Sequence, residues 1–328
     1  MESRPETVAA ATMILGLCGI DHDDRVAIWT DTAKHGPLPQ AFLTAALVRG
    51  ARPLLLRGTE TASQLLAAPP EAALKAFREC DLVVDIATQP WLYTTANADT
   101  LRAGVSILQV LLEEDDVERL VPRQQIADEA KRLIAGLAGA REIRITSPKG
   151  TDATIRCGSR RFAYQAGFVE KPNHLYDSIG VSAITFYPER GAVDGLFMVD
   201  GPISLYPRCF LPDEPVAIRV KAGRAMDIAG GRDARRVAAW LTSYSDRDSY
   251  HFSHTGFGLD ARASLSALTP VDAESLRGGV NIALGSSMFP QGGGDVVSKS
   301  HLDAILLDAT FQVDGETLVS KGQVVSDK

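Results

Sequence analysis

The sequence predicts an α/β fold followed by an α+β fold. An N-terminal α/β domain with a mostly parallel sheet is expected over residues 1–140, and a C-terminal β-rich domain over residues 141–328. The length of 328 residues fits two domains at roughly 150 residues each. Up to residue 140, short apolar runs alternate with helical segments, which is typical of a parallel sheet covered on both faces. Beyond it, short alternating runs separated by turns indicate β-structure.

The N-terminal elements follow from apolar spacing and from residues that start or stop helices. Proline opens two of the predicted helices, and Gly50 stands where a C′ glycine ends the second one. Helical spacing predicts helices at Glu6–Gly16, Pro37–Arg49, Pro70–Cys80, Thr95–Arg102 and Arg123–Ala138. Continuous apolar runs predict buried strands at Asp24–Trp29, Pro53–Leu56, Asp81–Ile86 and Val105–Leu111. Right-handed crossovers are expected to join them.

The C-terminal part has a different pattern. A Ser-Pro-Lys-Gly turn separates its first two runs, and Val313-Asp314-Gly315-Glu316 is a hairpin turn before the last. One helix, Asp233–Ser243, interrupts the strands. Strands are predicted at Glu142–Ile145, Asp152–Cys157, Ala183–Tyr187, Gly195–Val199, Val216–Ala222 and Thr317–Val325.

Composition excludes several classes of function. With 34 basic and 41 acidic residues the formal charge is −7, which argues against a nucleic-acid partner, because phosphate binding needs clustered Lys and Arg. No apolar stretch approaches the ~20 residues that span a bilayer, so no membrane association is expected. The cysteines have no paired spacing, which favours reduced thiols in a cytoplasmic protein. They are Cys18, Cys80, Cys157 and Cys209.

The sharpest local feature is Ser300-His301-Leu302-Asp303. A His and an Asp two residues apart on a strand point to the same face, so both can reach one metal ion. The preceding Gln291-Gly292-Gly293-Gly294 forms a loop that would admit a ligand close to the backbone. The alternative for the pair is a surface His–Asp hydrogen bond.

A second feature is Ser253-His254-Thr255-Gly256-Phe257-Gly258. The glycines beside His254 are expected to leave room for a metal or a substrate, although a turn with an incidental His is the alternative. His251 is three residues away, so on a strand its ring should face away from that of His254. We therefore expect His254 to join the site, and we expect Phe168, Leu175, Phe257 and the Gly292–Gly294 loop to form pocket walls.

A third segment, Phe168-Val169-Glu170-Lys171-Pro172-Asn173-His174, adds a carboxylate, although alone it reads as an exposed loop. The three segments together supply two imidazoles and two carboxylates. Two His and a carboxylate suit non-haem Fe(II), which needs open positions for substrate and O₂, and they also suit a catalytic Zn²⁺. No Walker A loop, Gly-x-Gly-x-x-Gly fingerprint or Gly-x-Ser-x-Gly elbow is present.

The order of these three segments resembles the 2,5-dihydroxypyridine 5,6-dioxygenase family, which is related in fold to thermophilic metallo-aminopeptidases. The resemblance covers most of residues 140–328. It implies a β-rich metal-binding domain with one non-haem Fe(II) held by Glu170, His254, His301 and Asp303. It also implies a homo-oligomer and an extradiol-type opening of a small hydroxylated N-heterocycle or aromatic ring by O₂.

The sequence departs from the family's pattern at the pocket histidines. The first domain has only His22 and His35, and neither lies in a matching segment. His174 or Tyr176 would serve as acid/base, with a structural role as the alternative for each. A mono- or dinuclear metallohydrolase with Zn²⁺ or Co²⁺, resembling an aminopeptidase or amidase, is the runner-up. Its second glutamate would have to be one such as Glu274, where no matching motif is present. A binding protein without catalysis is the third hypothesis.

Overall fold

The computed structural model describes residues 3–34, 36–59, 68–88, 91–205, 208–289 and 291–325. The chain forms two compact units. The first contains Met1–Ile126 and Gln165–Val181, and the second contains Ala127–Tyr164 and Ser182–Lys328. The change of pattern predicted a single division near residue 140, whereas residues 165–181 return to the first unit because they supply a strand to its sheet.

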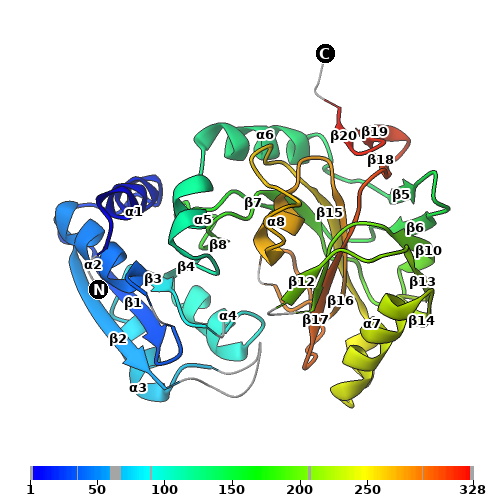
Figure 1. Cartoon of the computed structure of the whole chain (residues 1–328). Helices are drawn as coiled ribbons and strands as arrows, with labels where there is room; N and C mark the ends of the chain where they lie inside the picture. The colour runs from blue at the N-terminus through cyan, green and yellow to red at the C-terminus, as the bar shows by residue number, and fades with distance from the viewer. Residues whose placement is uncertain are drawn as a thin grey trace. The chain divides into compact units, whose positions relative to one another are not determined.

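The first unit is built on a parallel sheet with strand order β2-β1-β3-β4-β8 among the described residues (Figure 1). Every neighbouring pair is parallel, which confirms the parallel sheet expected from the apolar runs. β8 was not foreseen, because a three-residue strand has no periodicity to detect. The strands are β1 (Arg25–Asp31), β2 (Arg52–Gly58), β3 (Leu82–Asp85), β4 (Ser106–Gln109) and β8 (Tyr176–Ser178).

Helices cover this sheet in two groups. α1 packs on α2 and α5, and α3 packs on α4. The Phe77 ring of α3 lies 5.9 Å from that of Trp29 on β1 and 5.7 Å from that of Trp91, so it anchors α3 to the core. Gly50 follows α2 with φ +78°, as expected of a helix-ending glycine. The helices are α1 (Pro5–Leu17), α2 (Leu38–Val48), α3 (Glu71–Phe77), α4 (Thr95–Arg102) and α5 (Glu114–Arg119).

An acidic side chain is buried at the carboxyl end of β3. Burial raises the pKa of Asp85 to about 8. A hydrogen bond from the Ala87 backbone opposes this rise, and the charge of Asp31 adds to it. The ordinary pKa of an Asp is ~3.9, so between these values the folded chain holds a proton that the unfolded chain has released. Stability should therefore fall as pH rises through this window, by at most about 1.4 kcal/mol per unit from this group.

Replacing Asp85 by asparagine should remove this dependence while keeping an oxygen that accepts from the Ala87 amide. We expect urea unfolding of the D85N variant between pH 5 and 8 to lose stability less steeply than the parent. The same substitution at the half-exposed Asp99 of α4 is the control. Parallel curves for the parent and D85N would contradict a protonated Asp85.

The second unit contains two β-sheets. The eight-stranded sheet has the order β14-β13-β10-β6-β5-β18-β19-β20 among the described residues. The predicted strand Thr317–Val325 is wrong: Lys321 and Gly322, at φ +48° and +74°, break it into the hairpin β19–β20. The strands are β5 (Glu142–Thr146), β6 (Asp152–Arg156), β10 (Val193–Val199), β13 (Val216–Lys221), β14 (Arg224–Ala229), β18 (Thr310–Val313), β19 (Glu316–Ser320) and β20 (Gln323–Val324).

The seven-stranded sheet has the order β12-β11-β17-β16-β15-β9-β7, again among the described residues. α8 (Pro270–Ser275) packs on it, and α7 (Arg232–Ser243) packs on β13 and β14 of the other sheet. The remaining helices are α6 (Gln124–Ala135) and the 3₁₀ turn Arg247–Tyr250. The strands are β7 (Phe162–Gln165), β9 (Ala183–Phe186), β11 (Ile203–Leu205), β12 (Arg208–Phe210), β15 (Phe252–Gly258), β16 (Val280–Gly285) and β17 (His301–Leu306).

Aromatic pairs join the two sheets into one core. Phe197 of β10 stacks on Phe252 of β15, and Phe311 of β18 meets Phe257 of β15 edge to face, each at 5.4 Å between centroids. One face of β15 therefore belongs to the core between the sheets. Side chains on the other face are available for a site.

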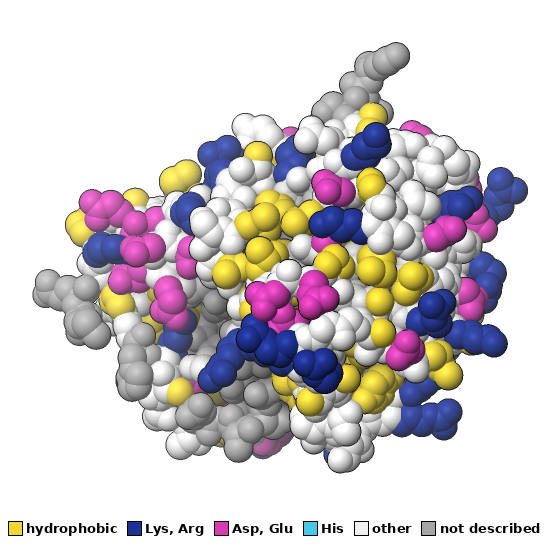
Figure 2. All heavy atoms as spheres, turned by 45° about the vertical axis from the view of Figure 1, so that its right-hand side comes forward, with side chains coloured by type: hydrophobic (Ala, Val, Ile, Leu, Met, Phe, Trp, Pro, Cys, Tyr) yellow, Lys and Arg dark blue, Asp and Glu magenta, His cyan; other side chains and the backbone are white. Residues whose placement is uncertain are grey.

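No helix among the described residues is long and apolar enough to cross a membrane. On the face drawn in Figure 2, Lys and Arg side chains lie interspersed with Asp and Glu.

Candidate metal centre

Two strands of the seven-stranded sheet bring three candidate ligands together. His254 lies on β15, and His301 and Asp303 lie on β17. Their ligand atoms converge: Nε2 of His254 is 3.4 Å from Nε2 of His301, and Oδ1 of Asp303 is 3.2 Å and 3.3 Å from these two nitrogens. All three side chains are at least nine-tenths buried, and no His side chain is visible on the face of the described residues drawn in Figure 2.

The strand register explains the convergence. β16 lies between the two strands, and its Ala283 stands opposite Asp303. The side chain that β16 places between the ligands on this face is therefore a single methyl group. A register shift between Phe252 and Thr255 places two residues of β15 opposite one of β16. Such a bulge redirects side chains. It turns His254 onto the face of Asp303, although Phe252 and Phe257 on the same strand point into the core.

Glycine serves this site differently from the expectation. A Cβ on Gly256 would lie 1.8 Å from the Ile184 carbonyl oxygen, and one on Gly258 would lie 2.4 Å from the Leu276 oxygen. These glycines therefore let neighbouring backbone approach β15 closely. The expectation that Phe257 forms a pocket wall is wrong, because its ring packs on Phe311 between the sheets.

A backbone carbonyl and a hydroxyl group fix the orientation of the His301 ring on the side away from the cluster. Nδ1 of His301 lies 2.8 Å from the Ser286 carbonyl oxygen, which also accepts a 2.6 Å bond from the Ser253 hydroxyl. A bond of this kind places the ring proton on Nδ1 and leaves the Nε2 lone pair for a cation. The carbonyl of Ser286 thus links β15 to the ligand on β17.

The electrostatics favour the forms that bind metals. Burial, the largest influence on Asp303, would raise the pKa of its carboxyl, but the charges and hydrogen bonds of both histidines outweigh it and hold the pKa well below its ordinary value. Burial lowers the pKa of His254 despite the nearby carboxylate. For His301, Asp303 and Ser286 outweigh burial and raise the pKa. Metal binding here therefore competes with a proton on His301.

A further acid lies near this centre. Burial raises the pKa of Glu274, on α8, well above its ordinary value, and the charge of Asp303 adds to the rise. Burial and the neighbouring charge both disfavour the ionised form of Glu274, and its carboxyl is not among the converging ligand atoms of His254, His301 and Asp303. The sequence showed no motif at Glu274, because its position depends on α8 packing on β17.

The donor set fits a single ion. Two donors that each lie ~2.0–2.2 Å from one ion are roughly 2.8–3.6 Å apart at angles of about 90–109°. The observed separations of 3.2–3.4 Å lie in this range. Two imidazoles and one carboxylate are the set found in non-haem Fe(II) oxygenases, and Zn²⁺ and Co²⁺ accept the same donors.

Aromatic side chains pack beside the cluster. Tyr187 directly follows β9, whose Phe186 pairs with Thr255, so its ring stands across from His254 with 5.1 Å between centroids. Phe289 also stacks on Tyr187, with 5.3 Å between centroids and 13° between ring planes. Tyr187 was not predicted to belong to this cluster, since its placement depends on which strand pairs with β15.

Comparison with known proteins places the chain in a family. The sequence profile described as 2,5-dihydroxypyridine 5,6-dioxygenase matches residues 6–326. The chain belongs to the 2,5-dihydroxypyridine 5,6-dioxygenase family. Its classification as a ring-cleaving dioxygenase, predicted from the order of the three segments, is thereby confirmed at the level of the family.

A curated relative is similar in sequence, and two solved structures share the fold. The curated 2,5-dihydroxypyridine 5,6-dioxygenase of Pseudomonas putida is 24% identical over 266 residues, covering 78% of this chain and 74% of that protein. A solved structure of 2,5-dihydroxypyridine dioxygenase from Pseudomonas putida superposes with a TM-score of 0.89 at 20% identity, over 98% and 97% of the two chains. AmpT from Thermus thermophilus superposes at 0.68 with 15% identity, over 98% and 99%.

The other predicted site residues of this dioxygenase-family chain belong to the first unit. Glu170 and His174 exchange two backbone hydrogen bonds of 2.8 and 2.9 Å. Nε2 of His174 lies 2.7 Å from a buried Asp177 oxygen, and the Tyr176 hydroxyl donates to Gln109 at 2.7 Å. These contacts give His174 and Tyr176 structural partners within their own unit. The roles predicted for Glu170, His174 and Tyr176 stay predictions.

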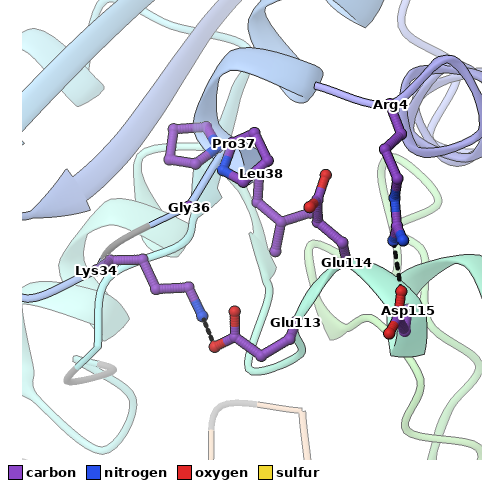
Figure 3. A pocket seen from close by; sticks show the side chains of 9 residues that line it. Arg4, Lys34, Gly36, Pro37, Leu38, Glu113, Glu114 and Asp115 are labelled. Carbon is purple, nitrogen blue, oxygen red and sulfur yellow. Dashed lines mark hydrogen bonds and ion pairs between the residues drawn. The ribbon is translucent and has the colours of Figure 1, made fainter. Parts of the chain in front are cut away.

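The remaining first-unit features add no ligand. His22 is exposed and lies beside Asp23, and His35 lies outside the described residues. A hollow of about 290 Å³ in the first unit has charged walls (Figure 3). Lys34 pairs with Glu113 there, and Arg4 pairs with Asp115. Because its two cations are paired with carboxylates of the walls, this hollow is a weaker candidate for a metal or substrate site than the histidine cluster.

Proposed function

We propose that this chain is a non-haem Fe(II) dioxygenase that opens the ring of a small dihydroxylated N-heterocycle, 2,5-dihydroxypyridine or a close analogue. His254, His301 and Asp303 would hold the ion, with Glu170 as a further ligand on the strength of the family resemblance. The observation that carries the proposal is the convergence of two imidazole nitrogens and one carboxylate oxygen within 3.2–3.4 Å in a buried site. The chemistry in the name of the family requires activation of O₂, which such a donor set supports.

In the proposed reaction both atoms of O₂ enter the product. The bond between ring carbons 5 and 6 breaks, the hydroxylated carbon becomes a carboxylic acid, and the carbon beside nitrogen becomes a formyl group. Bound Fe(II) would supply the redox chemistry that lets O₂ react with the ring. No further oxidant or reductant is needed, because the two oxygen atoms account for the four electrons that the ring gives up.

The protein's own groups have separate tasks in this scheme. Asp303 and Glu170 would supply two negative charges, which with two neutral imidazoles balance a divalent cation, and an anionic oxygen of the substrate ring would bind the ion at an open coordination position. Burial of the cluster keeps bulk water away and strengthens these interactions. We propose that His174 or Tyr176 moves the proton of the substrate hydroxyl. His174 suits this task because a buried Asp177 oxygen lies 2.7 Å from Nε2 and orients the ring.

The test is anaerobic loading of the purified chain with Fe(II), followed by O₂ uptake with 2,5-dihydroxypyridine. We expect one O₂ consumed per ring opened, and no uptake by the metal-free or zinc-loaded protein. A protein with bound iron that takes up no O₂ with any dihydroxylated pyridine would refute the proposal. Metal analysis addresses the hydrolase alternative, since two zinc or cobalt ions per chain would favour hydrolysis.

We also propose that the chain works in the cytoplasm as a homo-oligomer with no nucleic-acid or membrane partner. All four cysteines are free thiols in the structure, which supports a reducing compartment. Light scattering coupled to size exclusion measures the assembly directly. A monomer at micromolar concentration would contradict the oligomer.

A further inference from the structure

Asn281 is an unusual residue for its position. It is the second residue of β16, within the otherwise apolar and fully buried run Val280–Gly285, and it is 1% exposed. Neither its Oδ1 nor its Nδ2 has a hydrogen-bond partner among the described residues. Buried amides in folded proteins are almost always hydrogen-bonded, so an exception of this kind calls for a functional explanation.

The strand register places Asn281 on the metal-binding face. It is two residues from Ala283, which stands opposite Asp303, and residues two apart on a strand share a face. Its own partner on β15 is Gly256, two residues beyond His254. Because Gly256 has no side chain, nothing from that position stands between the amide and the neighbouring imidazole.

The neighbouring imidazole, that of His254, also has a ring nitrogen without a hydrogen-bond partner among the described residues. Nε2 of His254 faces the other two ligands, at 3.2 and 3.4 Å. Nδ1 is therefore the nitrogen on the other side of the ring, and it has no hydrogen-bond partner among the described residues. The Asn281 amide lies close enough to this imidazole to interact with it.

The other histidine of the cluster, His301, has a hydrogen-bond acceptor at its Nδ1. Its Nδ1 lies 2.8 Å from the Ser286 carbonyl oxygen, which fixes the tautomer that binds a cation through Nε2. Metal-binding histidines almost always have such an acceptor behind them. Around His254, Asn281 is the polar side chain whose position and open hydrogen-bonding capacity suit that task.

We propose that Asn281 is a positioning residue of the metal centre, whose Oδ1 accepts a hydrogen bond from Nδ1–H of His254 and so presents the Nε2 lone pair to the ion. This inference rests on the metal centre of the proposed function. It predicts the tautomer of His254 and assigns a role to the one polar side chain of β16. Loss of such an acceptor typically lowers metal affinity about 10–100-fold.

The experiment compares two substitutions at one position. N281L removes the acceptor at similar volume, whereas N281D keeps an acceptor oxygen. Co²⁺ affinity, measured in competition with a chelator, should fall about 10–100-fold in N281L and stay within a few-fold of the parent in N281D. The cobalt absorption spectrum should change in N281L alone. The matched control is N97L, because Asn97 is equally buried, at 2%, in the first unit.

Two results would overturn the inference: unchanged Co²⁺ affinity in N281L, or equal losses in N281L and N281D. If N281L does not fold, ¹⁵N NMR of the zinc-loaded parent decides the question. Nδ1 of His254 should be protonated and Nε2 metal-bound, and the opposite tautomer would refute the assignment. A parent chain that binds no divalent metal would refute both this inference and the proposed function. Metal binding without oxygenation would refute only the proposed function.

Discussion

Alanine at Asp303 should abolish divalent metal binding and, with it, all O₂ uptake. Among the described residues Asp303 is the one carboxylate in the converging cluster, and the two histidines hold its pKa well below the ordinary value, which favours the ionised form. Removing it takes away the charged donor that lies against both imidazoles. Loss of a group behind a ligand already lowers affinity about 10–100-fold, so loss of the ligand itself should exceed that range. Isothermal titration with Co²⁺ or Zn²⁺ measures the effect.

Two buried histidines, one on β15 and one just before it, provide a matched control for the same prediction. His254 and His251 are 3% and 4% exposed, are three residues apart, and differ in that only His254 belongs to the cluster. Burial lowers the pKa of His251 to about 4, so its ring is neutral at pH 7. H254A should lose the metal, whereas H251A should retain it with circular dichroism unchanged. If H251A abolished binding and H254A did not, the ligand assignment would be wrong.

The sequence was informative where structure follows from local periodicity. Continuous apolar runs such as Leu82–Asp85 predicted the parallel sheet, since a strand buried on both faces needs no alternation. The period of two residues likewise placed His301 and Asp303 on one face of one strand, and the register of β17 with β16 agrees. Both inferences use distances along the chain that never exceed a few residues.

Features that depend on pairing between distant segments were beyond the sequence. β8 joins β4 although Tyr176 is far from Ile107 in the chain, and the division of the second unit into two sheets depends on similar pairings. His254 faces the cluster because of a bulge, which alternation of residue types does not reveal. Asn281 did leave a signal, an isolated amide in an apolar run, but its meaning required the neighbour on β15.

The glycine loop after Phe289 leads to the second strong prediction, because it packs against an aromatic side chain at the cluster. A Cβ on Gly292 would lie 2.0 Å from Cδ2 and 2.4 Å from Cε2 of Tyr187. The tyrosine ring has little freedom to retreat, because it is 2% exposed and packs on Phe289 and His254, whose ring centroids are 5.3 and 5.1 Å away. An alanine at position 292 must therefore displace the loop or push the ring toward His254.

We expect G292A to destabilise the protein by about 1–3 kcal/mol, the usual effect of overpacking, and to weaken Co²⁺ binding through the displaced imidazole. Urea unfolding and chelator competition measure the two effects separately. G136A is the control, because the nearest atom to its added Cβ, the Leu133 oxygen, is at an ordinary 3.6 Å. Shortening Tyr187 to alanine in the G292A background should recover part of the loss. Coupling between the two substitutions in this double-mutant cycle would identify the tyrosine as the link between the loop and the metal ligand, whereas additive effects would exclude it.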